Sequence, residues 1–86
     1  MTALPAEQFV RGLETPISSY AGPLGRLVLR KKVRDLHILD TSVDEAQAKR
    51  LLYEFGAAIQ VVLGEEAEVR TMARIREVMR EMGLRV

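Results

Sequence analysis

The 86-residue chain contains no cysteine and no tryptophan, a single histidine, two tyrosines and two phenylalanines. Without cysteine the chain has neither a disulfide framework nor a thiolate metal site, which excludes the usual means of stabilising a small extracellular domain. The cytoplasm is therefore the expected compartment. Long apolar runs are also missing: no stretch approaches the roughly 18 residues of a membrane span, and Glu7 and Arg11 interrupt the region where a signal peptide would be apolar. The sequence predicts neither a secreted protein nor a membrane protein.

The length of the chain limits its organisation. Residues 1–86 are expected to form one small domain, because autonomous domains usually contain roughly 100 to 200 residues. A domain of this size buries only about 60 to 65% of the surface that its unfolded chain exposes, which leaves a thin margin over the entropy lost on folding. Self-association into a homodimer or a higher homo-oligomer would cover more apolar surface, and it is the expected state.

The second half of the chain has the pattern of two amphipathic helices. Apolar residues recur at intervals of three and four within residues 48–63 and again within residues 69–82, so each stretch has one broad apolar face that another surface must cover. Gly64 lies between them and allows the chain to reverse, so the pattern predicts an αα-hairpin. The residues expected at the core or at an interface with a protein partner, and taken as the candidate interaction face, are Leu51, Phe55, Ile59, Val62, Met72, Ile75, Met79 and Met82.

The start and the continuity of the first of these helices depend on two features. Ser42 and Glu45 have the spacing of a capping box, in which each side chain accepts a hydrogen bond from the backbone N–H of the other residue. A helix is therefore predicted to begin between them. Gly56 offers an alternative, because a glycine can end a helix and the β-branched residues within 57–63 would then suit a strand. The apolar register continues across Gly56, which favours one helix over residues 43–63.

The start of the chain is expected to form a further helix. Pro5 suits a first helical turn, where its missing N–H costs nothing. The helix is predicted to reach Tyr20 with a kink at Thr15-Pro16, because a hydroxyl residue followed by proline is itself a helix-start signal. Gly22-Pro23 then breaks the chain.

Residues 24–36 carry apolar side chains on two opposite sides of a helical wheel. This pattern indicates either a central, largely buried helix or two strands at 26–30 and 35–39. The turn between such strands lacks the Gly, Asn or Asp that a tight hairpin prefers, so the helix is favoured. The predicted fold class is therefore all-α, a small helical bundle built around a C-terminal αα-hairpin. The alternative is an α+β fold with strands near 26–39 and 57–63.

One stretch resembles a known kind of domain. It reads L-x3-I-x2-Y-x-G-P-L-x3-V-L and consists of Leu13, Ile17, Tyr20, Gly22, Pro23, Leu24, Val28 and Leu29. This stretch is similar to the Y-x-G-P-[IL] signature of small helical tail domains at the ends of some bacterial and archaeal regulatory proteins, such as kinases and response-regulator-like chains. The resemblance implies an all-helical bundle whose role is association or regulation and not chemistry. It assigns a function to no individual residue.

Basic residues are concentrated in one segment, where Asp35 is the only acidic neighbour. They are Arg26, Arg30, Lys31, Lys32 and Arg34. Solvated charge on a helix face is the ordinary explanation, and the alternative is an anion or nucleic-acid patch. The pI of about 8.2 is below the value of about 9 above which nucleic-acid-binding domains usually lie, and tryptophan for base stacking is absent. Nucleic-acid binding is therefore the alternative function and not the preferred one.

No residue pattern points to catalysis. His37 is the only histidine, and a metal site there would need Asp35 and Asp40 to converge on it. Gly22 and Gly25 lack the spacing of loops that cradle phosphates, so no cofactor is predicted. The predicted function is a non-catalytic protein–protein interaction or regulatory module that acts through an apolar helical face and self-associates.

Overall fold

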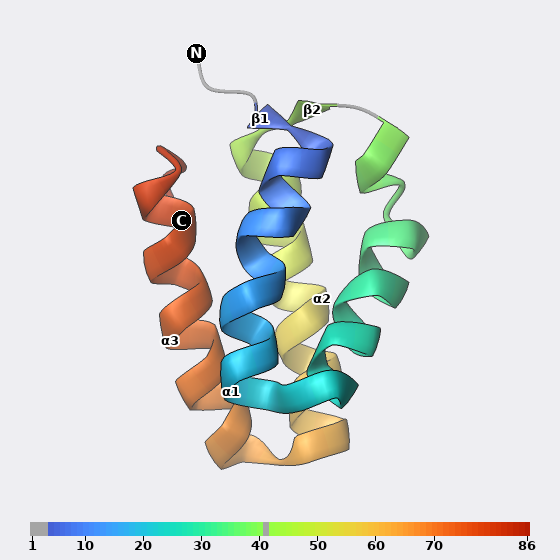
Figure 1. The fold of residues 1–86 in the computed structure, drawn as a ribbon, viewed down its shortest axis with the longest axis vertical. Coiled ribbons are helices and arrows are strands. Elements are labelled where there is room, and N and C mark those ends of the chain that lie inside the picture. The colour runs from blue at the N-terminus through green and yellow to red at the C-terminus, as the bar shows by residue number, and fades with distance from the viewer. Residues whose placement is uncertain (1–3, 41) are drawn as a thin grey trace.

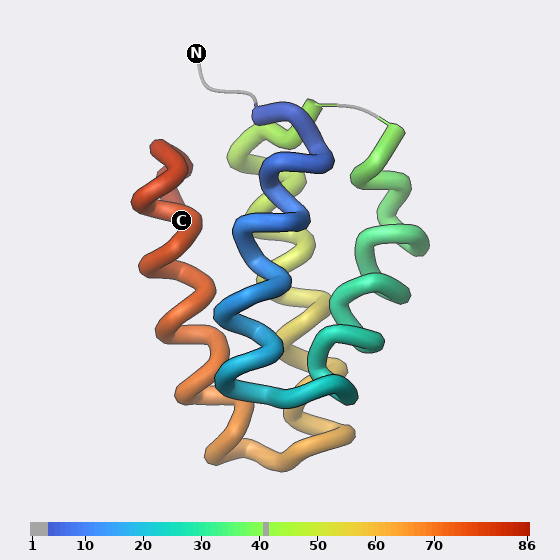
Figure 2. The backbone as a smooth tube through the Cα atoms, in the orientation of Figure 1, coloured from blue at the N-terminus to red at the C-terminus, as the bar shows by residue number. Residues whose placement is uncertain are grey.

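A computed structural model describes residues 4–40 and 42–86. Its helices pack side by side along their length (Figure 1). Helix α1 spans Ala6–Asp35, α2 spans Glu45–Leu63 and α3 spans Glu65–Glu81. Because α1 folds back on itself, it supplies two antiparallel arms, and four helical rods run up and down in turn (Figure 2). The predicted all-α bundle with a C-terminal αα-hairpin is confirmed.

The alternative α+β fold is wrong. Residues 26–35 lie in α1 and residues 57–63 lie in α2, so the segments proposed as strands are helical over these ranges. Within the described residues, strand pairing is confined to β1, Leu4–Pro5, and β2, Ser42–Val43, which are antiparallel. This short pair ties the start of the chain to the segment that precedes α2.

The two arms of α1 meet at Gly22, whose φ of 70° and ψ of −168° belong to a region that essentially only glycine occupies. The predicted break at Gly22-Pro23 is therefore confirmed. The kink expected at Pro16 is wrong, because within α1 only Gly22 departs from helical dihedral angles. Leu13 and Ile17 lie one turn apart on either side of Pro16 and are both buried, so core packing holds this arm continuous.

The start of α2 differs from the prediction. Asp44 is the N-cap: its Oδ1 accepts a hydrogen bond from the Gln47 N–H at 2.9 Å, and its own N–H donates to Gln47 Oε1 at 3.2 Å. The expected capping box between Ser42 and Glu45 is wrong because β2 is held extended by its pairing with β1, with the Val43 side chain fully buried. The helix therefore begins two residues later than expected.

The turn between α2 and α3 lies at Gly64, which has a φ of 97° and a ψ of 167°. Its N–H donates to the Gln60 carbonyl at 3.0 Å, and its carbonyl accepts from the Glu68 N–H at 3.1 Å, so Gly64 both ends α2 and starts α3. α2 runs without interruption through Gly56, where an added Cβ would lie 3.3 Å from the Met72 Cε of α3. Gly56 therefore serves close helix packing, and the predicted continuity of α2 is confirmed.

Side chains from every helix meet at the centre of the bundle. Those that are 3% exposed or less include Phe9, Leu13, Ile17, Leu29, Val33, Leu51, Phe55, Ile59, Met72, Ile75 and Met79. The space between Leu13, Leu29 and Phe55 is too small for a water molecule, as expected of a close-packed interior. The centre of the bundle is therefore packed core and not a ligand cavity.

The second arm of α1 lies at the edge of the bundle, beside the first arm and α2 (Figure 1). Leu29 and Val33 pack into the core, whereas Leu24 and Leu27 are 45% and 60% exposed. The expectation that residues 24–36 form a central, largely buried helix is wrong, because the rest of the chain covers only one side of this arm. Its other apolar side faces solvent.

Candidate interaction surface

The predicted interaction face is mostly core. The six of its eight residues that are 3% exposed or less are Leu51, Phe55, Ile59, Met72, Ile75 and Met79. Val62 is 45% exposed, and Met82 is partly buried against the core. Because the other helices of the same chain already cover the two apolar stripes, the six buried residues are not available to a partner. Of the eight, Val62 is the residue that lies on the open surface.

Exposed apolar side chains lie on two neighbouring elements, the second arm of α1 and α2. Leu24 and Leu27 of α1 are about half exposed, and on α2 the exposed fractions are 79% for Tyr53, 87% for Val61 and 45% for Val62. Single exposed apolar residues are ordinary on protein surfaces. These residues would indicate an interaction site only if they form one continuous patch.

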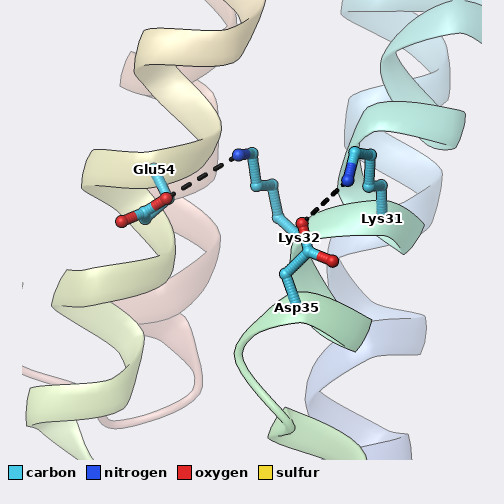
Figure 3. Close-up of polar contacts among 4 residues, drawn as sticks. All are labelled: Lys31, Lys32, Asp35 and Glu54. Atoms are coloured by element: carbon cyan, nitrogen blue, oxygen red, sulfur yellow. Dashed lines mark hydrogen bonds and ion pairs between the residues drawn. The ribbon is translucent and has the colours of Figure 1, made fainter.

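An ion pair defines how these two helices are aligned. Lys32 Nζ lies 3.7 Å from Glu54 Oε1, and the two helices run in opposite directions (Figures 1 and 3). Residues four positions apart share a helix face, so further pairs face one another toward the α2–α3 turn. The pairs at one and two turns from the ion pair are Val28 with Ala58 and Leu24 with Val62. Leu24 and Val62, which are both 45% exposed, are therefore neighbours across the two helices.

We call this surface the apolar seam. It consists of Leu24 and Val28 of α1 and Ala58, Val61 and Val62 of α2. Val61 adjoins Ala58 on the outer side of α2. Tyr53 and Ala57 lie on the other side of that helix, in a groove with Glu68, Met72 and Arg76 of α3. No charged residue occurs from Phe55 to Gly64. The apolar seam is therefore an uncharged surface over half of α2.

Charges border the apolar seam at one end, and they are paired. Lys32 meets Glu54 across the two helices, and Lys31 Nζ lies 3.0 Å from Asp35 Oδ2 within α1 (Figure 3). The hydrogen bond from Lys31 lowers the pKa of the Asp35 carboxyl below its ordinary value of 3.8, so this carboxylate is charged at neutral pH. Both lysines of the basic segment are thus paired, Lys32 with α2 and Lys31 within its own helix.

The exposed fractions indicate the size of the apolar seam. With the usual full surfaces of these residue types, the exposed parts of Leu24, Val61 and Val62 add up to roughly 300 Å². The largest apolar patch on a typical monomer is about 300 to 600 Å², and such patches are often functional. The apolar seam therefore has the size of a small interaction site.

The three arginines of the basic segment lie at four-residue spacing on the side of the arm that faces the first arm. Arg30 Nε donates to Glu14 Oε2 of the first arm at 3.1 Å. Arg26 and Arg34 are exposed, and neither has an acidic partner among residues 4–40 and 42–86. The predicted patch is divided between opposite sides of the arm, and three of its five cations are paired.

The residues considered for a metal site are not brought together. His37 follows α1 with a φ of 55°, and its Nδ1 lies 3.4 Å from Asp40 Oδ2, whereas Asp35 is engaged by Lys31. In the part of the chain that the structure describes, no three His, Asp or Glu side chains converge in a way that could hold a metal ion.

Comparison of the chain with known protein families, with curated proteins and with solved structures found no match. None of the helices in the described ranges is long and apolar enough to cross a membrane. The residues that carry the resemblance to helical tail domains surround the Gly22 reversal, with Leu13, Ile17 and Leu29 in the core and Tyr20 half exposed. In this chain they fold α1 back on itself.

The apolar seam was not predicted from the sequence, although two signals for it are present. Leu24 and Val28 lie on the second apolar side of residues 24–36, which was expected to be buried. The second signal is the uncharged stretch from Phe55 to Gly64, because a surface helix ordinarily carries charge on its outward positions. Together these signals indicate helix faces that the chain itself does not cover.

Proposed function

We propose that this protein is a non-catalytic interaction module that associates with a second copy of itself through the apolar seam. The observation that carries the proposal is the exposed, uncharged surface shared by the second arm of α1 and α2. Removing that surface from water is the main driving force available for association. The resemblance to tail domains of regulatory proteins supports a regulatory role, and the lack of cysteine favours the cytoplasm.

A second copy is the occupant that the apolar seam suits best. In a symmetric dimer the same patch meets itself, so any charge in the middle of the patch would face a like charge. The stretch from Phe55 to Gly64 carries none. Two copies of the apolar seam would bury roughly 600 Å² in total, which is below the roughly 1,200 Å² of stable protein interfaces. A weak, transient dimer is therefore expected.

Nucleic-acid binding by the basic segment is less well supported. Arg30, Lys31 and Lys32 are paired with acidic side chains, and these pairs would have to break before the cations could contact phosphates. The remaining arginines, Arg26 and Arg34, are too few for a nucleic-acid interface that depends on releasing many counterions.

Sedimentation equilibrium of the wild-type protein and of variants from micromolar to millimolar concentration tests the proposal. Leu24→Glu and Val61→Glu each place a carboxylate in the apolar seam, one on each helix. Each is expected to weaken dimerisation at least about tenfold, because the charge would have to be desolvated against an apolar partner surface. Circular dichroism should show unchanged helix content, since both side chains are exposed.

Leu39→Glu is the matched control. Leu39 is 58% exposed, compared with 45% for Leu24, but it lies in the 3-10 helix η1, Ile38–Asp40, at the opposite end of the arm. The control is expected to leave the dimer dissociation constant within about twofold of wild type, a difference below the cost of burying a charge. A wild-type protein that stays monomeric up to millimolar concentration would contradict the proposal, and so would equal losses from Leu39→Glu and Leu24→Glu.

A further inference from the structure

A polar groove lies on the side of the second arm that faces the first arm, away from the apolar seam. It is an open groove of about 610 Å³, and its lining residues are Arg11, Glu14, Thr15, Ser18, Ser19 and Arg26. Every one of these side chains is polar or charged, in contrast to the uncharged apolar seam. The two arms of α1 that supply this lining run side by side (Figure 2).

The ion pair between the arms determines the charge that is left in the groove. Arg30 Nε lies 3.1 Å from Glu14 Oε2, so the one carboxylate of the lining already has a cationic partner. Arg11 and Arg26 are exposed and have no acidic partner among the residues that the structure describes. The groove therefore offers two unpaired guanidinium groups and three hydroxyl groups, with its only acid neutralised.

The alignment of the arms places these groups in a row. Because Glu14 faces Arg30 and the arms are antiparallel, one turn further along each arm brings Ser18 to the level of Arg26. Arg11 lies seven residues before Ser18, which is roughly 10 Å along the helix axis at the usual rise. The two free arginines therefore approach the hydroxyl groups from opposite ends of the groove.

We propose that this groove binds the diphosphate group of a small phosphorylated molecule. Guanidinium groups donate paired hydrogen bonds to phosphate oxygens, and hydroxyl groups donate single ones, so the lining has the donors that such a ligand needs. Arg11 of the first arm and Arg26 of the second each contact one phosphate, with Ser18 opposite Arg26 and Thr15 between the levels of the two arginines. The separation of the arginines favours two linked phosphates over one.

A small ligand fits this groove better than a nucleic acid does. None of the lining residues is aromatic, so unstacked bases would have no side chain on which to stack. With Glu14 neutralised by Arg30, two free cations suit a compact diphosphate, whereas nucleic-acid binding usually relies on a longer row of phosphate contacts.

The proposal is tested by titrating the 86-residue protein with inorganic pyrophosphate at constant ionic strength. Binding is measured by isothermal titration calorimetry and by changes in amide chemical shifts. Saturable binding of pyrophosphate is expected, with the chemical-shift changes concentrated in residues 11–26. Inorganic phosphate should bind more weakly than pyrophosphate. Arg11→Gln and Arg26→Gln should each weaken pyrophosphate binding about tenfold or more, the usual effect of losing hydrogen bonds to a charged group. Ser18→Ala should have a smaller effect.

Arg50→Gln is the control for loss of positive charge. Arg50 is an exposed arginine of α2 with no acidic partner in the described ranges, and it lies outside the groove. This variant should bind pyrophosphate within about twofold of wild type, because screening weakens interactions between well-separated exposed charges. All of these variants keep the apolar seam intact, so dimerisation and pyrophosphate binding can fail independently.

Three results would overturn the proposal. The first is the absence of saturable pyrophosphate binding at low salt. The second is an equal loss of affinity in Arg50→Gln and Arg26→Gln, which would indicate unspecific attraction to a cationic protein. The third is binding of a single-stranded oligonucleotide that is tighter than pyrophosphate binding and insensitive to Arg11→Gln, which would assign the basic residues to nucleic acid.

Discussion

Replacing Gly64 by alanine tests the physical basis of the turn between α2 and α3. The φ of 97° and ψ of 167° lie in a region that is open essentially only to glycine. A Cβ added at this position would have no atom within 4 Å, so the cost of Gly64→Ala is conformational strain alone and not a steric clash. We expect this variant to lose about 1 to 3 kcal/mol of the free energy of unfolding.

Urea unfolding followed by circular dichroism measures this loss directly. A chain of this length has a total stability of roughly 4 to 13 kcal/mol. Gly64→Ala should therefore still fold at room temperature and should melt about 4 to 8 °C lower for each kcal/mol lost. The slope of the unfolding free energy against urea should not change, because the folded state buries the same surface.

A chemically synthesised protein with D-alanine at position 64 is the control. The mirror image of the Gly64 backbone conformation is an ordinary extended one, so a D-residue adopts it without strain. This protein should match wild type or gain about 0.4 to 1 kcal/mol, since the side chain restricts the unfolded chain. Equal losses from L-alanine and D-alanine, or no loss from L-alanine, would refute the argument from backbone strain.

Two further substitutions have effects that follow from single contacts. Thr71 is buried in α3, and its Oγ1 has no hydrogen-bond partner within the described residues, so Thr71→Val should raise the unfolding free energy by about 1 kcal/mol in urea titrations. A destabilised Thr71→Val would show that the hydroxyl is hydrogen-bonded in solution. Asp44→Ala removes the N-cap of α2 and should cost about 0.5 to 2 kcal/mol, measured by thermal unfolding. Asp44→Asn retains a capping oxygen and should cost clearly less, and equal losses from the two variants would rule out the capping explanation.

The helices themselves were largely predictable, because the signals that define them are local. The spacing of apolar residues within 48–63 and 69–82 predicted both helices of the hairpin, and Gly22 and Gly64 marked the reversals within α1 and between α2 and α3. The start of α2 was not predictable in the same way. β2 pairs with β1 nearly 40 positions earlier in the chain, and this pairing moves the N-cap from Ser42 to Asp44.

The candidate site depended on information that periodicity does not contain. A stripe of apolar residues shows that a helix face needs cover, but not whether the cover comes from the same chain or from a partner. In the structure, other helices of the same chain bury Phe55 and Met79, whereas Leu27 and Val61 remain exposed. The groove between the arms was missed for a related reason, since its residues come together only after α1 reverses.

The sequence by itself determined which segments are helical and placed the reversals at Gly22 and Gly64, because hydrophobic periodicity and glycine dihedral freedom act over a few residues. Tertiary structure alone decided which apolar faces became core and which remained on the surface. It also decided which arginines were left without an acidic partner. Those outcomes depend on how the four helical segments pack side by side, because each segment buries only the neighbouring helix faces that contact it.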